Sequence, residues 1–271
     1  WRLPRMLLAM LLGAALGLGG AIFQSLTRNP LGSPDIIGFA AGSHTGALVV
    51  LLLFSGGYYA TAFGALGGGI VTAMLVYLLA GTTGQQGFRL IVVGIGTSAM
   101  LSAFNAWLIQ KADLEMAMGA AFWAAGSLNG LGFEQLRPAA ILFCLLCLPL
   151  AALARPLRQM ELGDDAALAS GVTVRRARGL LMLLGVALTA VTTATAGPIS
   201  FIALCAPQIA RRLVGTSSVG LFPPALTGAV LLVLADAAAQ HAFDRQLPVG
   251  IMTISVGGLY LLWLLIREGR R

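Results

Sequence analysis

The sequence predicts an all-α membrane protein that crosses the bilayer several times. Hydrophobic residues make up 58% of the 271-residue chain and charged residues only 10%, whereas soluble domains carry about 25% charge. The mean hydropathy is +0.89, and the apolar residues gather in long stretches separated by short polar connections. A spanning helix needs about 20 mostly apolar residues, so each of these stretches is expected to be a membrane helix.

Nine stretches come close to this length, and we predict that each crosses the membrane once. They are residues 5–25, 36–54, 60–80, 90–110, 137–154, 178–196, 199–214, 223–241 and 249–266. The sixth and seventh come from one run, residues 179–210, that contains no charged residue. We divide this run at Gly197-Pro198, because proline removes a helical hydrogen bond and clashes with the preceding turn.

The basic residues support this division. With nine spans, 12 of the 17 lie on one side: Arg28, Arg89, Arg155, Arg158, Arg175, Arg176, Arg178, Arg211, Arg212, Arg267, Arg270 and Arg271. The other side has Arg2, Arg5, Lys111, Arg137 and Arg245. Positive charge concentrates on the cytoplasmic side, so the carboxyl terminus is predicted to be cytoplasmic. A single span over 179–210 would remove the asymmetry. The odd number of spans also leads us to expect a helix before Trp1, about ten in all.

Glycines at intervals of four predict closely packed helices. The sets are Gly13 and Gly17; Gly38, Gly42 and Gly46; and Gly64 and Gly68. Small residues at this spacing let helix backbones approach one another where lipid gives no hydrophobic drive for association. We therefore interpret these glycines as packing positions.

A polar stripe runs along the predicted helix 90–110. Ser98, Ser102 and Asn105 fall at positions i, i+4 and i+7 and so share one helix face. Such a stripe either bonds to a neighbouring helix or lines a water-filled path, and the spacing alone leaves both interpretations open.

Asp236 is the only acidic residue expected inside a span. Carboxylates in a membrane are costly and mark functional sites, so a proton-coupled secondary transporter that uses Asp236 is an alternative reading. Its position near the end of span 223–241 also allows a hydrated or capped carboxylate. The sequence contains neither a Walker phosphate loop nor a catalytic or metal-binding constellation, so we predict no enzyme activity, no metal site and no bound cofactor.

A polar, helix-forming island at residues 161–172 separates two long apolar segments. Leu162, Ala166 and Ala169 recur at helical spacing between Gly163 and Gly171, and two aspartates begin the helix, where they favour the helix dipole. Several arginines flank the island on the predicted cytoplasmic side. A solvated connector would not need small and apolar residues at exposed positions, so we interpret the island as a docking surface for a partner protein.

Several motifs in order resemble one transporter family over essentially the whole chain. They are Arg2-Leu-Pro-Arg5, Asn29-Pro-Leu-Gly-Ser-Pro-Asp-Ile-Ile-Gly38, Leu162-Gly-x-x-x-Ala-x-x-x-Gly-Val172, Ala196-Gly-Pro-Ile-Ser-Phe-Ile202 and Leu247-Pro-Val-Gly250. The chain resembles the permease subunits of the iron–siderophore and vitamin B12 ABC importers, the FecCD type. Within this family it is most similar to permeases of ferric-enterobactin importers, which carry a catecholate siderophore.

The resemblance implies one permease domain, residues 1–271, with the type II ABC importer fold in a bacterial cytoplasmic membrane. It implies two ATPase subunits that bind ATP and magnesium, a second permease that is a related heteromeric partner, an external siderophore-binding protein and surrounding lipid. No nucleic acid is expected as a partner. The coupling helix, within residues 155–178, would seat in the ATPase through Leu162, Gly163, Asp164, Asp165, Ala166, Ala169, Gly171 and Val172.

The resemblance also assigns residues to the outer docking surface and to the translocation pathway. Family members dock the binding protein through two arginines. Arg2 matches one of them, whereas Gln240 stands at the other position and leaves Arg245 as a candidate substitute. The helices at 90–110 and 249–266 would line the path with Ser98, Ser102, Asn105, Thr253 and Ser255. The expected cargo is a ferric catecholate siderophore; haem, vitamin B12 or a hydroxamate siderophore is the alternative.

Overall fold

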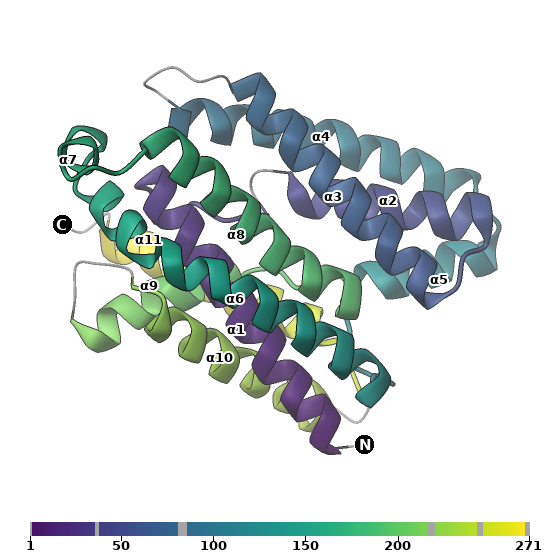
Figure 1. The fold of residues 1–271 in the computed structure, drawn as a ribbon. Helices are drawn as coiled ribbons and strands as arrows, with labels where there is room; N and C mark the ends of the chain where they lie inside the picture. Colours follow the sequence, from purple (N-terminus) through teal and green to yellow (C-terminus); the bar gives the residue numbers. More distant parts are fainter. Residues whose placement is uncertain (1, 36–37, 81–85, 216–219, 243–245, 269–271) are drawn as a thin grey trace.

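The chain folds into a bundle of helices (Figure 1). The computed structural model describes residues 2–35, 38–80, 86–215, 220–242 and 246–268, and these contain eleven helices and no strand. The helices are α1 (Arg2–Thr27), α2 (Phe39–Phe54), α3 (Tyr58–Ala80), α4 (Gln86–Lys111), α5 (Leu114–Ala124), α6 (Phe133–Glu161), α7 (Asp164–Ala169), α8 (Val174–Ala196), α9 (Ile202–Val214), α10 (Phe222–His241) and α11 (Val249–Glu268).

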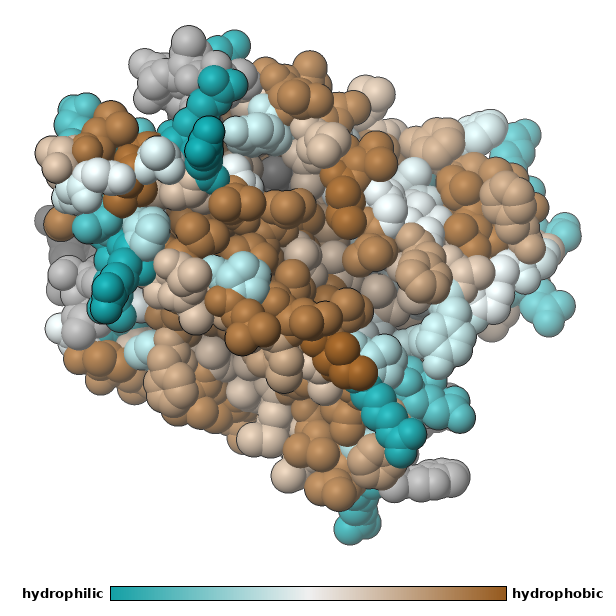
Figure 2. Space-filling model, viewed as in Figure 1, coloured by the Kyte–Doolittle hydropathy of each residue, from teal (hydrophilic) through white to brown (hydrophobic). Residues whose placement is uncertain are grey.

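Six of the described helices are long and apolar enough to cross a membrane: α1, α3, α4, α6, α8 and α10. The apolar helix α2 and the apolar stretch of α11, Val249–Tyr260, are shorter. All nine predicted spans coincide with a helix, but by length and composition the described residues supply six membrane-length helices, not nine. Figure 2 shows the apolar surface of one face as a broad belt with hydrophilic side chains toward its two ends.

Helix α1 lies at the centre of one group of helices. It packs against α6, α8, α9 and α10, and most of its residues are buried. The second group consists of α2, α3, α4 and α5, which pack on one another, and α3 joins this group to α8 (Figure 1). The amino terminus and the short helix α7 lie at opposite ends of the bundle, so α1 runs from one end of the molecule to the other.

The break between α8 and α9 is where the sequence predicted it, but α9 is shorter than expected. Helix α8 ends at Ala196, and Gly197 has a φ of 76°. The predicted span 199–214 begins as a helix only at Ile202, because Pro198 lacks an N–H and Phe201 adopts a left-handed φ of 70°. The resulting 13 residues of α9 extend about 20 Å at 1.5 Å per residue, too short for a crossing.

The chain nevertheless returns to the same end of the bundle across this break. Asp164 accepts hydrogen bonds from both Arg28 and Arg178, and Arg211 donates one to Gln24 on the last turns of α1. Arg28 just after α1, Arg178 near the start of α8 and Arg211 near the end of α9 therefore lie at the same end of the bundle. This convergence confirms the division of the run 179–210 into two segments.

The glycines predicted to pack helices do so by direct backbone contact, except Gly38, which lies just before α2 and has side chains as its nearest neighbours. A Cβ on Gly13 would collide with the carbonyl oxygen of Gly228, and one on Gly17 with that of Pro224, both on α10. In the second group, Gly46 of α2 lies equally close to the backbone of Gly64 of α3. These helix pairs have no layer of side chains between them at the glycines.

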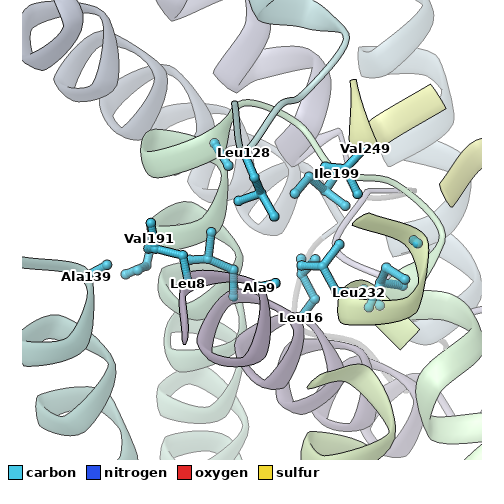
Figure 3. Close-up of a cluster of buried hydrophobic side chains, with 14 of the residues drawn as sticks. Leu8, Ala9, Leu16, Leu128, Ala139, Val191, Ile199, Leu232 and Val249 are labelled. Carbon is cyan, nitrogen blue, oxygen red and sulfur yellow. The ribbon is translucent and has the colours of Figure 1, made fainter. Parts of the chain in front are cut away.

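The largest apolar core surrounds the first half of α1. Leu8 and Leu16 of α1 contact a cluster to which Leu232 of α10 and Val249 of α11 contribute (Figure 3). Ile199, in the segment between α8 and α9, is buried in the same cluster. Non-helical backbone at membrane depth is tolerated only where protein covers it, and this core covers the break.

Candidate functional site

The predicted coupling island forms a short helix, α7, at one end of the bundle. Gly163 and Gly171, with φ of 128° and 82°, bound it and have open space around them. Their left-handed conformations let the chain leave α6, turn through α7 and enter α8. Leu162 is 81% exposed, and Ala166 and Ala169 are exposed as well. The structure thus brings the predicted small and apolar residues to the surface together.

One side of α7 is anchored and the other is open. Ala167 is completely buried in a core cluster with Leu157, Met160 and Val174, and Val172 packs against this cluster. Leu168, on the open side, is 57% exposed. The sequence analysis did not single out Leu168, although Leu162 and Leu168 are both exposed apolar side chains at this end of the bundle, as is typical of an interaction surface.

Asp164 attaches α7 to two other helices. Its carboxylate accepts hydrogen bonds from Arg28, just after α1, at 2.6 Å and from Arg178 of α8 at 2.8 and 2.9 Å. Arg28 also donates to the carbonyl of Met160 at 3.2 Å. Asp165 is exposed, so the two aspartates differ: Asp164 holds α7 in place, and Asp165 faces outward.

The last turns of α1 make further polar contacts at this end. Ser25 donates to Glu161 at 2.5 Å, and Gln24 donates to the carbonyl of Leu204 at 2.9 Å. Arg211, in the last turn of α9, donates to the Gln24 side chain at 2.6 Å. Helices α1, α6, α7 and α9 are therefore connected by hydrogen bonds beside the coupling surface.

A cleft of about 970 Å³ opens at the other end of the bundle. Its walls are the amino-terminal turns of α1, the connection between α5 and α6, and the carboxyl-terminal turns of α10. Arg2, the predicted docking residue, is exposed and lines this cleft, and its docking role stays a prediction. Arg245, the predicted substitute for the second docking arginine, lies outside the described residues.

Asp236 forms a buried ion pair on the wall of this cleft. Arg5 donates to both carboxylate oxygens, at 2.7 and 2.8 Å, and the two side chains are 15% and 6% exposed. Gln240 donates to the same carboxylate at 2.6 Å. Both carboxylate oxygens are thus occupied by neighbouring side chains, which argues against the proton-carrier role. Gln240 thus uses one N–H of its amide within the fold, on Asp236.

The predicted pathway residues lie in different surroundings. On α4, Asn105 is buried and donates to the carbonyl of Ala41 on α2 at 3.4 Å, while Ser102 is exposed. Ser98 lies beside Gly38, just before α2, so it and Asn105 both face α2. On α11, Thr253 is buried and Ser255 exposed, and each bonds to its own helix. The stripe thus makes helix contacts at two positions, and its role in a path stays a prediction.

Comparison with known proteins identifies the family. The model of the FecCD transport family matches residues 1–267. The chain belongs to the FecCD transport family. A FecCD relative, the ferric enterobactin transport system permease protein FepG of Escherichia coli (strain K12), is 56% identical over 272 residues, covering 100% of this chain and 82% of FepG.

Other FecCD relatives carry the names of different cargoes. The iron(3+)-hydroxamate import system permease protein FhuG of Bacillus subtilis (strain 168) is 38% identical, covering 98% of this chain and 82% of FhuG. The hemin transport system permease protein HmuU of Yersinia pestis is 34% identical, with the same two shares. The family therefore includes permeases for several iron compounds.

A solved structure has the same fold. The inward-facing conformation of a metal-chelate type ABC transporter matches with a TM-score of 0.88 and 31% identity, over 98% of this chain and 87% of that chain. The agreement extends over both groups of helices, and it places the six membrane-length helices of this FecCD chain in a known transporter architecture.

Proposed function

We propose that this chain is the permease subunit of a bacterial ABC importer that moves a ferric catecholate siderophore across the cytoplasmic membrane. It does not itself hydrolyse ATP; two partner ATPase subunits do so. The observation that carries the proposal is the surface of α7, where Leu162, Ala166 and Leu168 are exposed at the end of the bundle richest in arginine. The 56% identity to FepG supports the choice of cargo.

In the proposed assembly the chain contributes one permease domain, residues 1–271, and pairs with a second, related permease. The arginine-rich end faces the cytoplasm, by the rule that positive charge stays inside, and so does the carboxyl terminus. The cleft lined by Arg2 then faces the external binding protein. Helices α2 and α9, which are shorter, and α11, whose described apolar stretch is short, would complete nine transmembrane segments together with neighbouring non-helical residues and the partner subunit.

If α7 couples the ATPase to the permease, a new charge on its exposed side should uncouple ATP hydrolysis from transport. Ala166→Glu places a carboxylate where the ATPase would dock, and a mispaired charge in an interface costs several kcal/mol. Uptake by the reconstituted complex should fall roughly tenfold or more, while the protein still inserts in the membrane. Gly163→Arg should act in the same way and also strain the turn, because φ there is 128°.

The matched control is Ala112→Glu, at the turn between α4 and α5 on the opposite end of the bundle. It adds the same charge away from α7 and should leave uptake near the wild-type rate. Normal uptake by the Ala166→Glu complex would exclude α7 as the ATPase contact.

The docking role of Arg2 predicts an effect on the binding protein alone. Arg2→Glu reverses an exposed charge in the cleft, so the binding protein should associate more slowly and bind several-fold more weakly, as found for charges at an interface rim. Arg137→Glu is the control, because Arg137 is exposed on α6 near the same end but does not line the cleft. Equal docking affinities for Arg2→Glu and wild type would refute this role.

The cargo is tested by transport. The complex in vesicles, with ATP inside, should accumulate ferric enterobactin in preference to a ferric hydroxamate or haem. Preference for either of the latter would assign the chain to the group of FhuG or HmuU. Along the path we expect Ser98, Ser102, Asn105, Thr253 and Ser255 to offer weak polar contacts, since an anionic chelate must be released as well as bound.

A further inference from the structure

Helix α1 is anchored by side chains at both of its ends. At the inner end, Arg28 bonds to Asp164 of α7 and to the carbonyl of Met160 in the last turn of α6. At the outer end, Arg5 bonds to both oxygens of Asp236 on α10. The same helix therefore contacts the coupling surface at one end and forms a wall of the outer cleft at the other.

Between its ends, α1 packs on α10 and α9 without intervening side chains at three glycines. Added Cβ atoms on Gly13 and Gly17 would strike the backbone of α10, and one on Gly20 would strike the carbonyl oxygen of Ala203 on α9. Backbones in direct contact have no flexible side chains between them that could absorb a displacement. A shift of α1 along its axis must therefore move α10 with it or break these contacts.

The two helices that pack in this way also form two walls of the outer cleft. Arg2 and Arg5 come from α1, and Asp236 and Gln240 from α10. The Arg5–Asp236 pair ties these walls together where the binding protein would dock. A displacement that begins at α7 thus has a continuous route of short contacts to the docking surface.

We infer that Arg28 is a positioning residue that links the coupling helix to α1, and that α1 and α10 together transmit movement of α7 to the outer cleft. The inference rests on the proposed function. Its consequence is that nucleotide binding on the ATPase changes the affinity of the permease for the binding protein through Arg28. Because such coupling is reciprocal, the binding protein must change nucleotide affinity by the same factor.

The test measures docking affinity with and without a non-hydrolysable ATP analogue. The sample is the complete complex in lipid nanodiscs, in the wild type and in the Arg28→Met variant. Typical coupling corresponds to a ~5–150-fold change in affinity. The wild type should show a change of this order, whereas in Arg28→Met the change should shrink to less than about twofold, with docking in the absence of nucleotide unaltered. Arg28→Lys, which keeps the charge near Asp164, should restore most of the response.

Arg178→Met provides the contrast. It removes the other arginine bound to Asp164 but leaves the link between α7 and α1, so the nucleotide response should persist. A wild-type response in Arg28→Met, or its loss only in Arg178→Met, would overturn the role of Arg28. The wild type is measured before any variant. Absence of any nucleotide response in the wild type would count against the importer function itself, and so against both proposals.

Discussion

The two ends of α1 hold ion pairs of opposite character. At the outer end, Arg5 and Asp236 are 15% and 6% exposed and make a two-pronged contact that Gln240 completes. At the inner end, Arg28 and Asp164 are 50% and 42% exposed, and Asp164 is shared with Arg178. A buried charge that loses its partner destabilises the protein strongly, whereas an exposed charge that loses its partner is hydrated by water at little cost. The outer pair is thus suited to hold two helices together, whereas the inner pair contributes little to stability and serves to link α7 to α1 through Arg28.

This difference matches what each end would have to do. The outer pair ties the two walls of a docking cleft together, so α1 and α10 should move there as one unit. The inner pair lies beside a surface that a moving ATPase would push on, and Arg28 links that surface to α1. The comparison predicts that mutations of the outer pair act mainly on stability, and mutations of the inner pair mainly on coupling.

The largest loss of stability should come from leaving Arg5 unpaired. Asp236→Ala removes its partner at a buried position, and breaking a buried pair in this way typically costs about 3–5 kcal/mol. The free energy or midpoint of unfolding of the permease in detergent is the measurement. The double variant Arg5→Met with Asp236→Leu should regain most of the loss, because it removes both charges. A loss below about 1 kcal/mol for Asp236→Ala alone would mean that water reaches the pair.

A smaller loss should follow from separating α1 and α10. Gly17→Ala forces a methyl group against the carbonyl of Pro224, and overpacking of this kind costs about 1–3 kcal/mol. Gly67→Ala on α3 is the matched control, since nothing lies within 4 Å of its added Cβ; it should be neutral or stabilise by up to about 1 kcal/mol, as alanine favours a helix. Equal unfolding midpoints for the two variants would show that α1 and α10 can move apart.

The features that follow from local pattern could be predicted from the sequence. Apolar stretches gave the positions of the long helices, glycine spacing gave the close contacts of Gly13 and Gly17, and the small residues of 161–172 gave α7 and its exposed side. Helix α5 was missed, because its 11 residues are too few to register as a span. The length of α9 was overestimated because the left-handed Phe201 leaves no local signal.

The pairing of charges could not be predicted in the same way. Arg28 and Asp164 are 136 positions apart, and Arg5 and Asp236 are 231 apart, so no periodicity relates them. Asp236 was recognised as a costly carboxylate, but its partner depends on how α1 and α10 cross. Similarly, the stripe on α4 was correctly placed on one face, but only the packing of α2 places Ser98 and Asn105 against a neighbouring helix.

The smallest effect on stability should be that of Arg28. Exposed ion pairs contribute at most about 1 kcal/mol, and in Arg28→Met the carboxylate of Asp164 keeps Arg178 as a partner. Unfolding midpoints of wild type and Arg28→Met should therefore differ slightly at low salt. They should coincide near 1 M salt, where the screening length is about 3 Å. The loss in Asp236→Ala should survive the same salt, because buried pairs are screened much less. If the Arg28 loss also persisted in high salt, the inner pair would stabilise the fold as the outer pair does, and the contrast between the two ends of α1 would be wrong.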